Sequence, residues 1–120
     1  MVLRGLMYQK RGINCPSAPW TMHEFFAGSG LVAYGLRGMF APVWANDISE
    51  QKAAVYEANF GCEQFILDDI KNVKGNDLPF AHLSWASFPC QDLSLAGSIG
   101  GIHASRSGLV WEWLRVLDEM

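Results

Sequence analysis

Residues 24–31, Glu-Phe-Phe-Ala-Gly-Ser-Gly-Leu, join a predicted strand to a predicted helix through a glycine turn. The run from Thr21 to Phe26 favours a short strand, and the turn Ala27-Gly28-Ser29-Gly30 breaks it. Glycine permits a tight turn and lets a ligand approach the backbone closely. A helix is predicted over Leu31 to Gly38, with Gly38 as its stop signal. The segment therefore indicates the first strand–turn–helix unit of an α/β domain.

The rest of the chain repeats this alternation. Further strands are predicted over Pro42 to Asn46, Glu63 to Leu67 and Ala81 to Phe88. Further helices are predicted over Glu50 to Phe60, with Ser49 as cap and Gly61 as end, and over Ser107 to Glu119. Strands that alternate with helices form a mostly parallel sheet with right-handed crossovers. The expected fold class is α/β, with about four strands and flanking helices.

Composition fits one globular domain. The 120 residues are 50% hydrophobic and 18% charged, which suits a soluble protein with a real core. No apolar run approaches the roughly 20 residues that cross a bilayer. Residues 1–10 hold too short an apolar stretch for a secretory signal, so we expect a cytoplasmic location and no membrane association.

The cysteines and charges exclude several classes of protein. Cys15, Cys62 and Cys90 are odd in number and contain no CxxC pair, which disfavours a disulfide framework and a zinc site. We therefore expect no bound metal and a reducing compartment. Residues 1–20 carry three basic and no acidic side chains, whereas the other hundred carry 6 basic and 12 acidic ones. Such an acidic body is a poor DNA clamp by itself.

We expect residues 1–20 to be a flexible N-terminal extension and residues 21–120 to form the domain. The extension contains glycine, proline and serine without clear periodicity. The sequence leaves open whether translation begins at Met1, Met7 or Met22. The extension is accordingly either an ordinary disordered tail or upstream read-through.

Polar residues follow the predicted strands where a ligand would bind. In a parallel α/β sheet, ligands bind beyond the carboxyl ends of the strands. The Gly28-Ser29-Gly30 turn leads into a helix whose free N–H groups can hold an anion. Asp47 lies 19 residues after Gly28, near the spacing at which an acid binds ribose hydroxyls. Asp68 or Asp69 could accept from an adenine amino group, so these residues describe a nucleoside-shaped pocket.

Cys90 follows the fourth predicted strand in the loop Pro89-Cys90-Gln91. A buried structural thiol usually has periodic apolar neighbours, whereas small and polar residues follow this one. The setting is typical of a nucleophile presented at the mouth of a cleft. The thiolate is the reactive form, and no lysine or histidine next to Cys90 is available to lower its pKa.

Four segments resemble, in order, the first four motifs of the DNA (cytosine-5)-methyltransferase family. They are Glu24-Phe25-Phe26-Ala27-Gly28-Ser29-Gly30, Ala45-Asn46-Asp47, Asp68-Asp69-Ile70 and Ser87-Phe88-Pro89-Cys90-Gln91-Asp92-Leu93-Ser94-Leu95-Ala96-Gly97. Arg106-Ser107-Gly108-Leu109 resembles the next motif. The resemblance runs from about His23 to Leu117, and its Phe-Pro-Cys-Gln segment is the most specific part.

The resemblance implies a Rossmann-like methyltransferase fold with S-adenosyl-L-methionine as cofactor. Phe26 would lie against the adenine, Asp47 would bind the ribose, and Asp69 with Ile70 would meet the adenine edge. The glycines of the turn would let the methionine part approach the backbone. The implied cofactor-binding residues are Phe26, Ala27, Gly28, Ser29, Gly30, Leu31, Asp47, Ile48, Asp69, Ile70 and Pro89.

The resemblance also implies methylation of double-stranded DNA at carbon 5 of a cytosine in an unknown target sequence. Cys90 would add to carbon 6 of a cytosine flipped out of the duplex. Gln91, Ser94 and Arg106 would contact the DNA or the cytosine. Such enzymes belong to restriction–modification systems, which implies a prokaryotic or phage protein near the nucleoid.

The later motifs of the family are missing from this sequence. These include a Glu-Asn-Val segment that activates the flipped cytosine and the target-recognition domain. We therefore expect residues 21–120 to be a partial catalytic domain, with an unpaired edge at the strand Ala81 to Phe88. We expect it to self-associate or to need a complementary C-terminal polypeptide for activity.

Two other functions stay open beside the methyltransferase. One is an inactive S-adenosylmethionine-binding module or gene remnant. The other is an unrelated cysteine hydrolase or a nicotinamide-binding Rossmann domain. No His/Asp pattern accompanies Cys90, which argues against the hydrolase. The turn lacks the third glycine of the GxGxxG fingerprint, which argues against the dehydrogenase.

Overall fold

The computed structural model describes residues 18–89 and 108–120. Its strands are β1 (Trp20–Phe25), β2 (Phe40–Asp47), β3 (Phe65–Leu67) and β4 (Leu83–Ala86). Its α-helices are α2 (Leu31–Leu36), α3 (Glu50–Phe60) and α4 (Gly108–Glu119), and two short 3₁₀ helices are η1 (Ile70–Asn72) and η2 (Gly75–Asp77). Every predicted strand and helix is thus present, with changed bounds for most of them. Trp20, predicted to end the flexible extension, begins β1.

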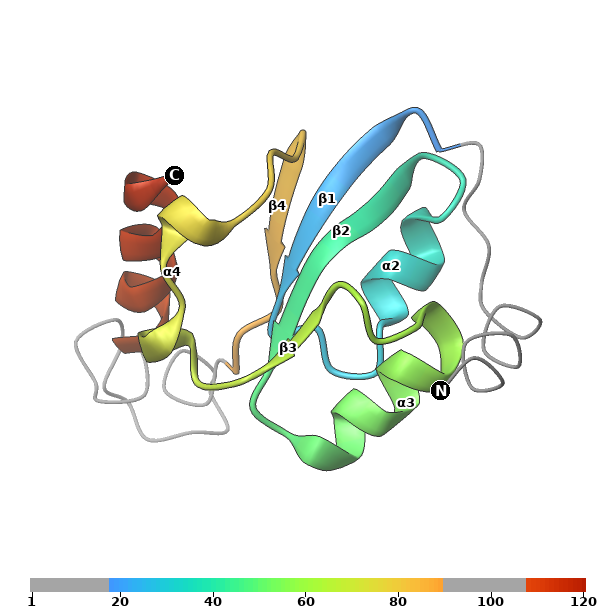
Figure 1. Cartoon of the computed structure of the whole chain (residues 1–120), viewed down its shortest axis with the longest axis horizontal. Coiled ribbons are helices and arrows are strands. Elements are labelled where there is room, and N and C mark those ends of the chain that lie inside the picture. Colours follow the sequence, from blue (N-terminus) through green and yellow to red (C-terminus); the bar gives the residue numbers. More distant parts are fainter. Residues whose placement is uncertain (1–17, 90–107) are drawn as a thin grey trace, which may run out of the picture.

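The four strands form one sheet in the order β3-β2-β1-β4, and every neighbouring pair is parallel. Helices α2 and α3 lie on one side of this sheet and α4 lies on the other (Figure 1). This arrangement confirms the predicted α/β fold class. β4 has one strand neighbour among the described residues, so it forms an edge of the sheet.

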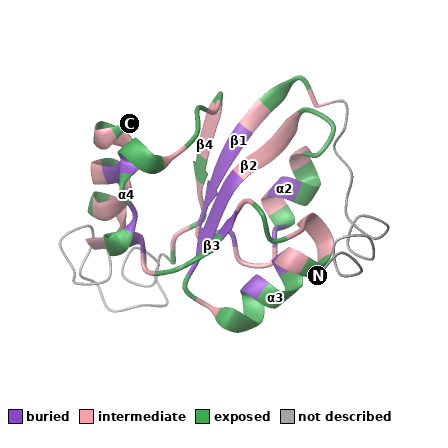
Figure 2. Ribbon diagram, in the orientation of Figure 1, coloured by how far each residue is buried: buried purple, intermediate pink, exposed green. Residues whose placement is uncertain are grey.

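Two hydrophobic clusters hold the helices to the sheet, and buried residues fill the carboxyl-terminal halves of β1 and β2 (Figure 2). The cluster under α4 consists of Phe25, Trp44, Ile70, Val73 and Val116. The cluster under α3 consists of Ala27, Ala45, Ala53, Tyr56 and Phe65. Because successive strand side chains point to opposite faces, β2 contributes Trp44 to the first cluster and its neighbour Ala45 to the second.

Helix α3 has the bounds that its sequence predicts. The Ser49 hydroxyl accepts a hydrogen bond from the Lys52 N–H at 3.4 Å, and the helix ends at Gly61, whose φ is 87°. Ala53 and Tyr56, three residues apart on one face of the helix, are buried. Ala54 is exposed, because it lies about 100° around the helix from Ala53.

The segment between β3 and β4 differs from the prediction. It contains the two 3₁₀ helices, and both strands that flank it are shorter than expected. β3 starts late because residues 62–65 form a turn, in which the Phe65 N–H donates to the Cys62 carbonyl at 3.4 Å. β4 ends at Ala86, although the Ser87 N–H still donates to the Phe25 carbonyl of β1 at 3.1 Å. In the part of the chain that the structure describes, no helix is long and apolar enough to cross a membrane.

Candidate active site

The carboxyl ends of all four strands meet at one edge of the sheet, and backbone hydrogen bonds join their first loop residues. The Ala27 N–H after β1 donates to the Asn46 carbonyl at 2.8 Å. The Asp68 N–H after β3 donates to the Asp47 carbonyl, and the Ser87 N–H after β4 donates to the Phe25 carbonyl, both at 3.1 Å. The predicted glycine turn, the predicted acids and the entry to the cysteine loop therefore line a single edge.

The glycine turn needs its glycines for two reasons. Gly28 and Gly30 have φ values of 56° and 87°, in the left-handed region that favours glycine. A Cβ on Gly30 would also lie 2.5 Å from the Phe60 ring and 2.9 Å from the Tyr56 ring, so Gly30 lets α3 pack against the turn. A Cβ on Gly28 would meet the Lys52 side chain at an ordinary 3.8 Å. Close packing therefore requires a glycine at position 30, whereas at position 28 only the backbone conformation does.

Phe26 adopts a left-handed backbone conformation, with φ of 54°, which is uncommon for an aromatic residue. Its half-buried ring meets the Phe88 ring edge-on, with centroids 6.0 Å apart. Strained backbone of this kind tends to occur at ligand sites. Phe26 thus sits between the end of β1 and the residue pair Phe88-Pro89 that precedes Cys90.

Asp47 ties the end of β2 to the glycine turn. Its Oδ2 accepts from the Gly28 N–H at 2.8 Å, and its Oδ1 accepts from the Ser49 N–H at 2.9 Å. Each oxygen retains a second lone pair, so the carboxylate can still accept from hydroxyl groups. The next residue, Ile48, is 69% exposed and offers an apolar surface beside this acid.

Asp68 and Asp69 differ in the hydrogen bonds that they already make. The Asp68 Oδ1 accepts from the Asp69 N–H and from the Asn72 side chain, each at 2.7 Å. The Asp69 Oδ1 accepts from the Lys71 N–H at 3.0 Å, which caps η1. Within the described ranges, Asp69 Oδ2 has no hydrogen-bond partner. The same holds for Asp68 Oδ2, but Asp68 is exposed, whereas Asp69 is half-buried beside the buried Ile70.

Glu24, for which no role was predicted from the sequence, is fully buried in β1. Neither carboxyl oxygen has a hydrogen-bond partner among the described residues. Burial raises the pKa of Glu24 from 4.5 to about 7, while the Ala33 and Val32 N–H groups of α2 oppose the rise without reaching full hydrogen-bond geometry. A glutamate inside a predicted strand, directly before two phenylalanines, is a signal that could have identified this residue.

The remaining predicted residues fall into two groups. Ser29 is half-buried, Leu31 is 77% exposed in the first turn of α2, and Pro89 is exposed where β4 leads into the cysteine loop. The predicted nucleophile and DNA-contact residues lie outside the described residues; they are Cys90, Gln91, Ser94 and Arg106. Residues 18–89 and 108–120 contain no group of three or more metal-ligating side chains.

A parallel sheet with a glycine turn and acids at its carboxyl edge defines a Rossmann-like α/β protein. A family model for C-5 cytosine-specific DNA methylase matches residues 20–120. This match covers most of the sequence, and the chain therefore belongs to that family.

Individual relatives agree with the family match. The chain is 38% identical over 97 residues to the type II methyltransferase M.Bsp6I of Bacillus sp. (strain RFL6), covering 78% of this chain and 30% of that protein. It is 31% identical over 112 residues to M.BsuFI of Bacillus subtilis, covering 92% and 26%. The crystal structure of S. pombe Dnmt2 methyltransferase matches with a TM-score of 0.59 and 25% identity, over 82% of this chain and 31% of that one. The chain thus spans less than a third of the length of these relatives.

Proposed function

We propose that this chain is the cofactor-binding and nucleophile-bearing part of an enzyme that methylates DNA at carbon 5 of cytosine. One observation carries the proposal. In a chain of the cytosine-methylase family, the glycine turn, Asp47, Asp69 and the Phe88-Pro89 pair follow four adjacent strands along one edge of the sheet. That order would place a nucleoside-shaped ligand beside the loop that carries Cys90.

The residues at this edge fit S-adenosyl-L-methionine, which supplies a methyl group on a sulfonium. Phe26 offers an aromatic ring for the adenine, and Ile48 offers exposed apolar surface. Asp47 has lone pairs for ribose hydroxyls, and Asp69 Oδ2 can accept from the adenine amino group. At Gly28 a Cβ would meet only the flexible Lys52 side chain, at 3.8 Å, and the methionine part is proposed to lie against this turn. Ala27, Ser29, Gly30, Leu31, Ile70 and Pro89 complete the proposed cofactor site.

The proposed chemistry begins at Cys90. Its thiolate adds to carbon 6 of a flipped cytosine, which breaks the ring's aromaticity and makes carbon 5 nucleophilic. Carbon 5 then takes the methyl group, a base removes the carbon 5 proton, and the Cys90 sulfur leaves carbon 6. Gln91, Ser94 and Arg106 contact the DNA or the cytosine in this proposal.

The proposal includes a second polypeptide on the β4 side of the sheet. β4 is an edge strand, and its Trp85 is 43% exposed. On α4, Trp111 and Leu114 are 53% and 42% exposed. An unpaired edge with exposed apolar side chains favours association with another chain. A complementary C-terminal polypeptide is the proposed partner, and self-association is the alternative that size measurement would reveal.

A covalent-trapping experiment tests the proposed function. The chain is mixed with S-adenosylmethionine and mixed-sequence DNA that carries 5-fluorocytosine, alone and together with the C-terminal part of M.Bsp6I. Fluorine at carbon 5 cannot leave as a proton does, so the Cys90–cytosine bond should persist on a denaturing gel. We expect the adduct to be lost completely in Cys90→Ser.

Cys62→Ser is the matched control, because Cys62 is an exposed free thiol elsewhere on the molecule. It should form the adduct as the wild type does. No adduct in either mixture, with or without the C-terminal part, would overturn the proposal of an enzyme. Titration with S-adenosylhomocysteine would then show whether the chain binds the cofactor without chemistry.

A further inference from the structure

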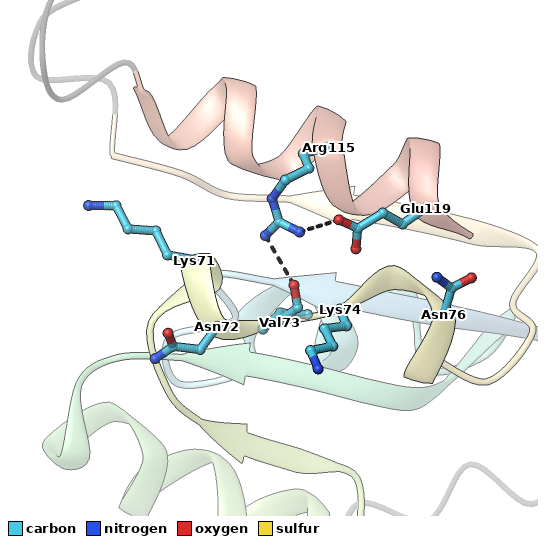
Figure 3. Close-up of a pocket in the computed structure, with 7 residues that line it drawn as sticks. All are labelled: Lys71, Asn72, Val73, Lys74, Asn76, Arg115 and Glu119. Atoms are coloured by element: carbon cyan, nitrogen blue, oxygen red, sulfur yellow. Dashed lines mark hydrogen bonds and ion pairs between the residues drawn. The ribbon is translucent and has the colours of Figure 1, made fainter.

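Arg115 joins α4 to the segment that follows β3 (Figure 3). Its guanidinium donates to the backbone carbonyls of Ile70 at 3.1 Å and Val73 at 3.0 Å. It also forms ion pairs on its own helix with Glu112 at 2.8 Å and Glu119 at 2.6 Å. Both pairs raise the pKa of Arg115, so the bridging group stays charged. Two carbonyls at the start and end of η1 are thus held by one fixed cation.

Glu119 adds a second link between the same two elements. Its Oε2 accepts from the Gly75 N–H at 2.8 Å, and this bond, followed by that to Arg115, lowers the pKa of Glu119. Gly75 permits the contact, because a Cβ there would lie 2.1 Å from the Val116 carbonyl oxygen. Helix α4 therefore contacts the backbone of residues 70–75 directly.

The contacts of Arg115 and Glu119 with the backbone of residues 70–75, called the clamp below, lie next to the turn that begins with Asp69. The Asp69 Oδ1 caps η1 through the Lys71 N–H, while Arg115 holds the Ile70 carbonyl of the same turn. The Ile70 side chain is buried in the cluster under α4. Asp69 thus belongs to a turn whose next residue is held by α4.

The groove beside this clamp has a volume of about 690 Å³, but its residues do not form a ligand site of their own. Four of the five guanidinium N–H groups of Arg115 are already used within the protein. Lys71 and Lys74 are both exposed to solvent. The groove is therefore best explained as the outer side of the Arg115 contact.

We infer that Arg115 is a positioning residue for the adenine edge of the cofactor, acting through η1 on Asp69. The inference rests on the proposed function, because it assigns Asp69 to the adenine amino group. Removal of the guanidinium frees the Ile70 and Val73 carbonyls and lets Asp69 leave its position. The selectivity for adenine should then fall more than the affinity for the rest of the cofactor.

The test compares S-adenosylhomocysteine with its inosine analogue, which has an oxygen in place of the adenine amino group. A hydrogen bond to a carboxylate should make the wild-type chain prefer the adenine ligand by about 10-fold or more in Kd. In Arg115→Met this ratio should approach one, and Arg115→Lys should restore part of it. Calorimetry of protein shown to be folded by circular dichroism gives both values of Kd.

Glu112→Gln is the matched control, since it removes an ion pair of Arg115 and leaves both carbonyl contacts in place. It should retain the wild-type ratio. If both Arg115 variants keep the wild-type ratio, the positioning role is wrong, even where both affinities fall together. If the wild-type chain binds neither ligand, the proposed cofactor site itself fails, which is a distinct result.

Discussion

Gly30→Ala is expected to lower the free energy of unfolding by about 2–5 kcal/mol, a large part of the stability of a domain this size. Left-handed backbone costs a side-chain-bearing residue about 1–2 kcal/mol, and Gly30 has φ of 87°. The new Cβ would also lie 2.5 Å from the Phe60 ring and 2.9 Å from the Tyr56 ring, so overpacking adds to the cost. Urea unfolding followed by circular dichroism measures the loss.

Two other glycines separate these causes. Gly28→Ala has the left-handed backbone without the steric overlap, so about 1–2 kcal/mol is expected. Gly38→Ala has neither, because a Cβ there meets nothing within 4 Å, and its stability should match the wild type or exceed it slightly. An equal loss in Gly30→Ala and Gly28→Ala would show that the rings of Phe60 and Tyr56 move aside at little cost.

The alternation of strands and helices could be predicted because its local signals agree with each other. Ser49 and Gly61 bound α3 as cap and stop residues do, and the structure uses both in that way. The glycine turn could be predicted as well, since glycine occupies both positions, 28 and 30, at which the backbone is left-handed. Gathering of the acids at one edge then follows from the parallel sheet.

The contacts between distant segments could not be predicted. The attachment of η1 to Arg115 has no local pattern, because the acceptors are backbone carbonyls about 40 residues earlier in the chain. The packing role of Gly30 likewise depends on where Phe60 lies in space. Such features require the tertiary structure, whatever the propensities of the segments involved.

Phe26 and Glu24 are intermediate cases. Phe26 was assigned to the site through a family resemblance, but its left-handed backbone is visible only in the structure. Glu24 stood in the quoted motif without a role, although its burial makes it the most perturbed carboxyl group among the described residues. A sequence pattern can locate such residues. The free energy that they cost depends on how far the surrounding protein excludes solvent from them.

The buried Glu24 carboxyl group should make the free energy of unfolding fall as the pH rises. The folded pKa of about 7 lies above the ordinary 4.5, so the folded chain binds more protons than the unfolded chain between these values. The free energy of unfolding should therefore decrease by about 2–3 kcal/mol through this group from pH 5 to pH 8. Glu24→Gln cannot ionise and should lack this decrease, which urea unfolding across the pH range would measure.

The pH dependence due to Glu24 must be separated from that due to His23, which is buried next to it on the opposite face of β1. Burial lowers the pKa of His23, against the effect of its hydrogen bond to the Pro79 carbonyl, so His23 lowers stability as the pH falls through 6.5 and below. Its contribution has the opposite sign and is present in both proteins, so it cancels when the two stability curves are subtracted. The buried Gln amide adds a constant offset to that difference and leaves its slope unchanged. Parallel curves for wild type and Glu24→Gln would mean that the carboxyl group keeps its ordinary pKa, and that water or a residue outside the described ranges solvates it.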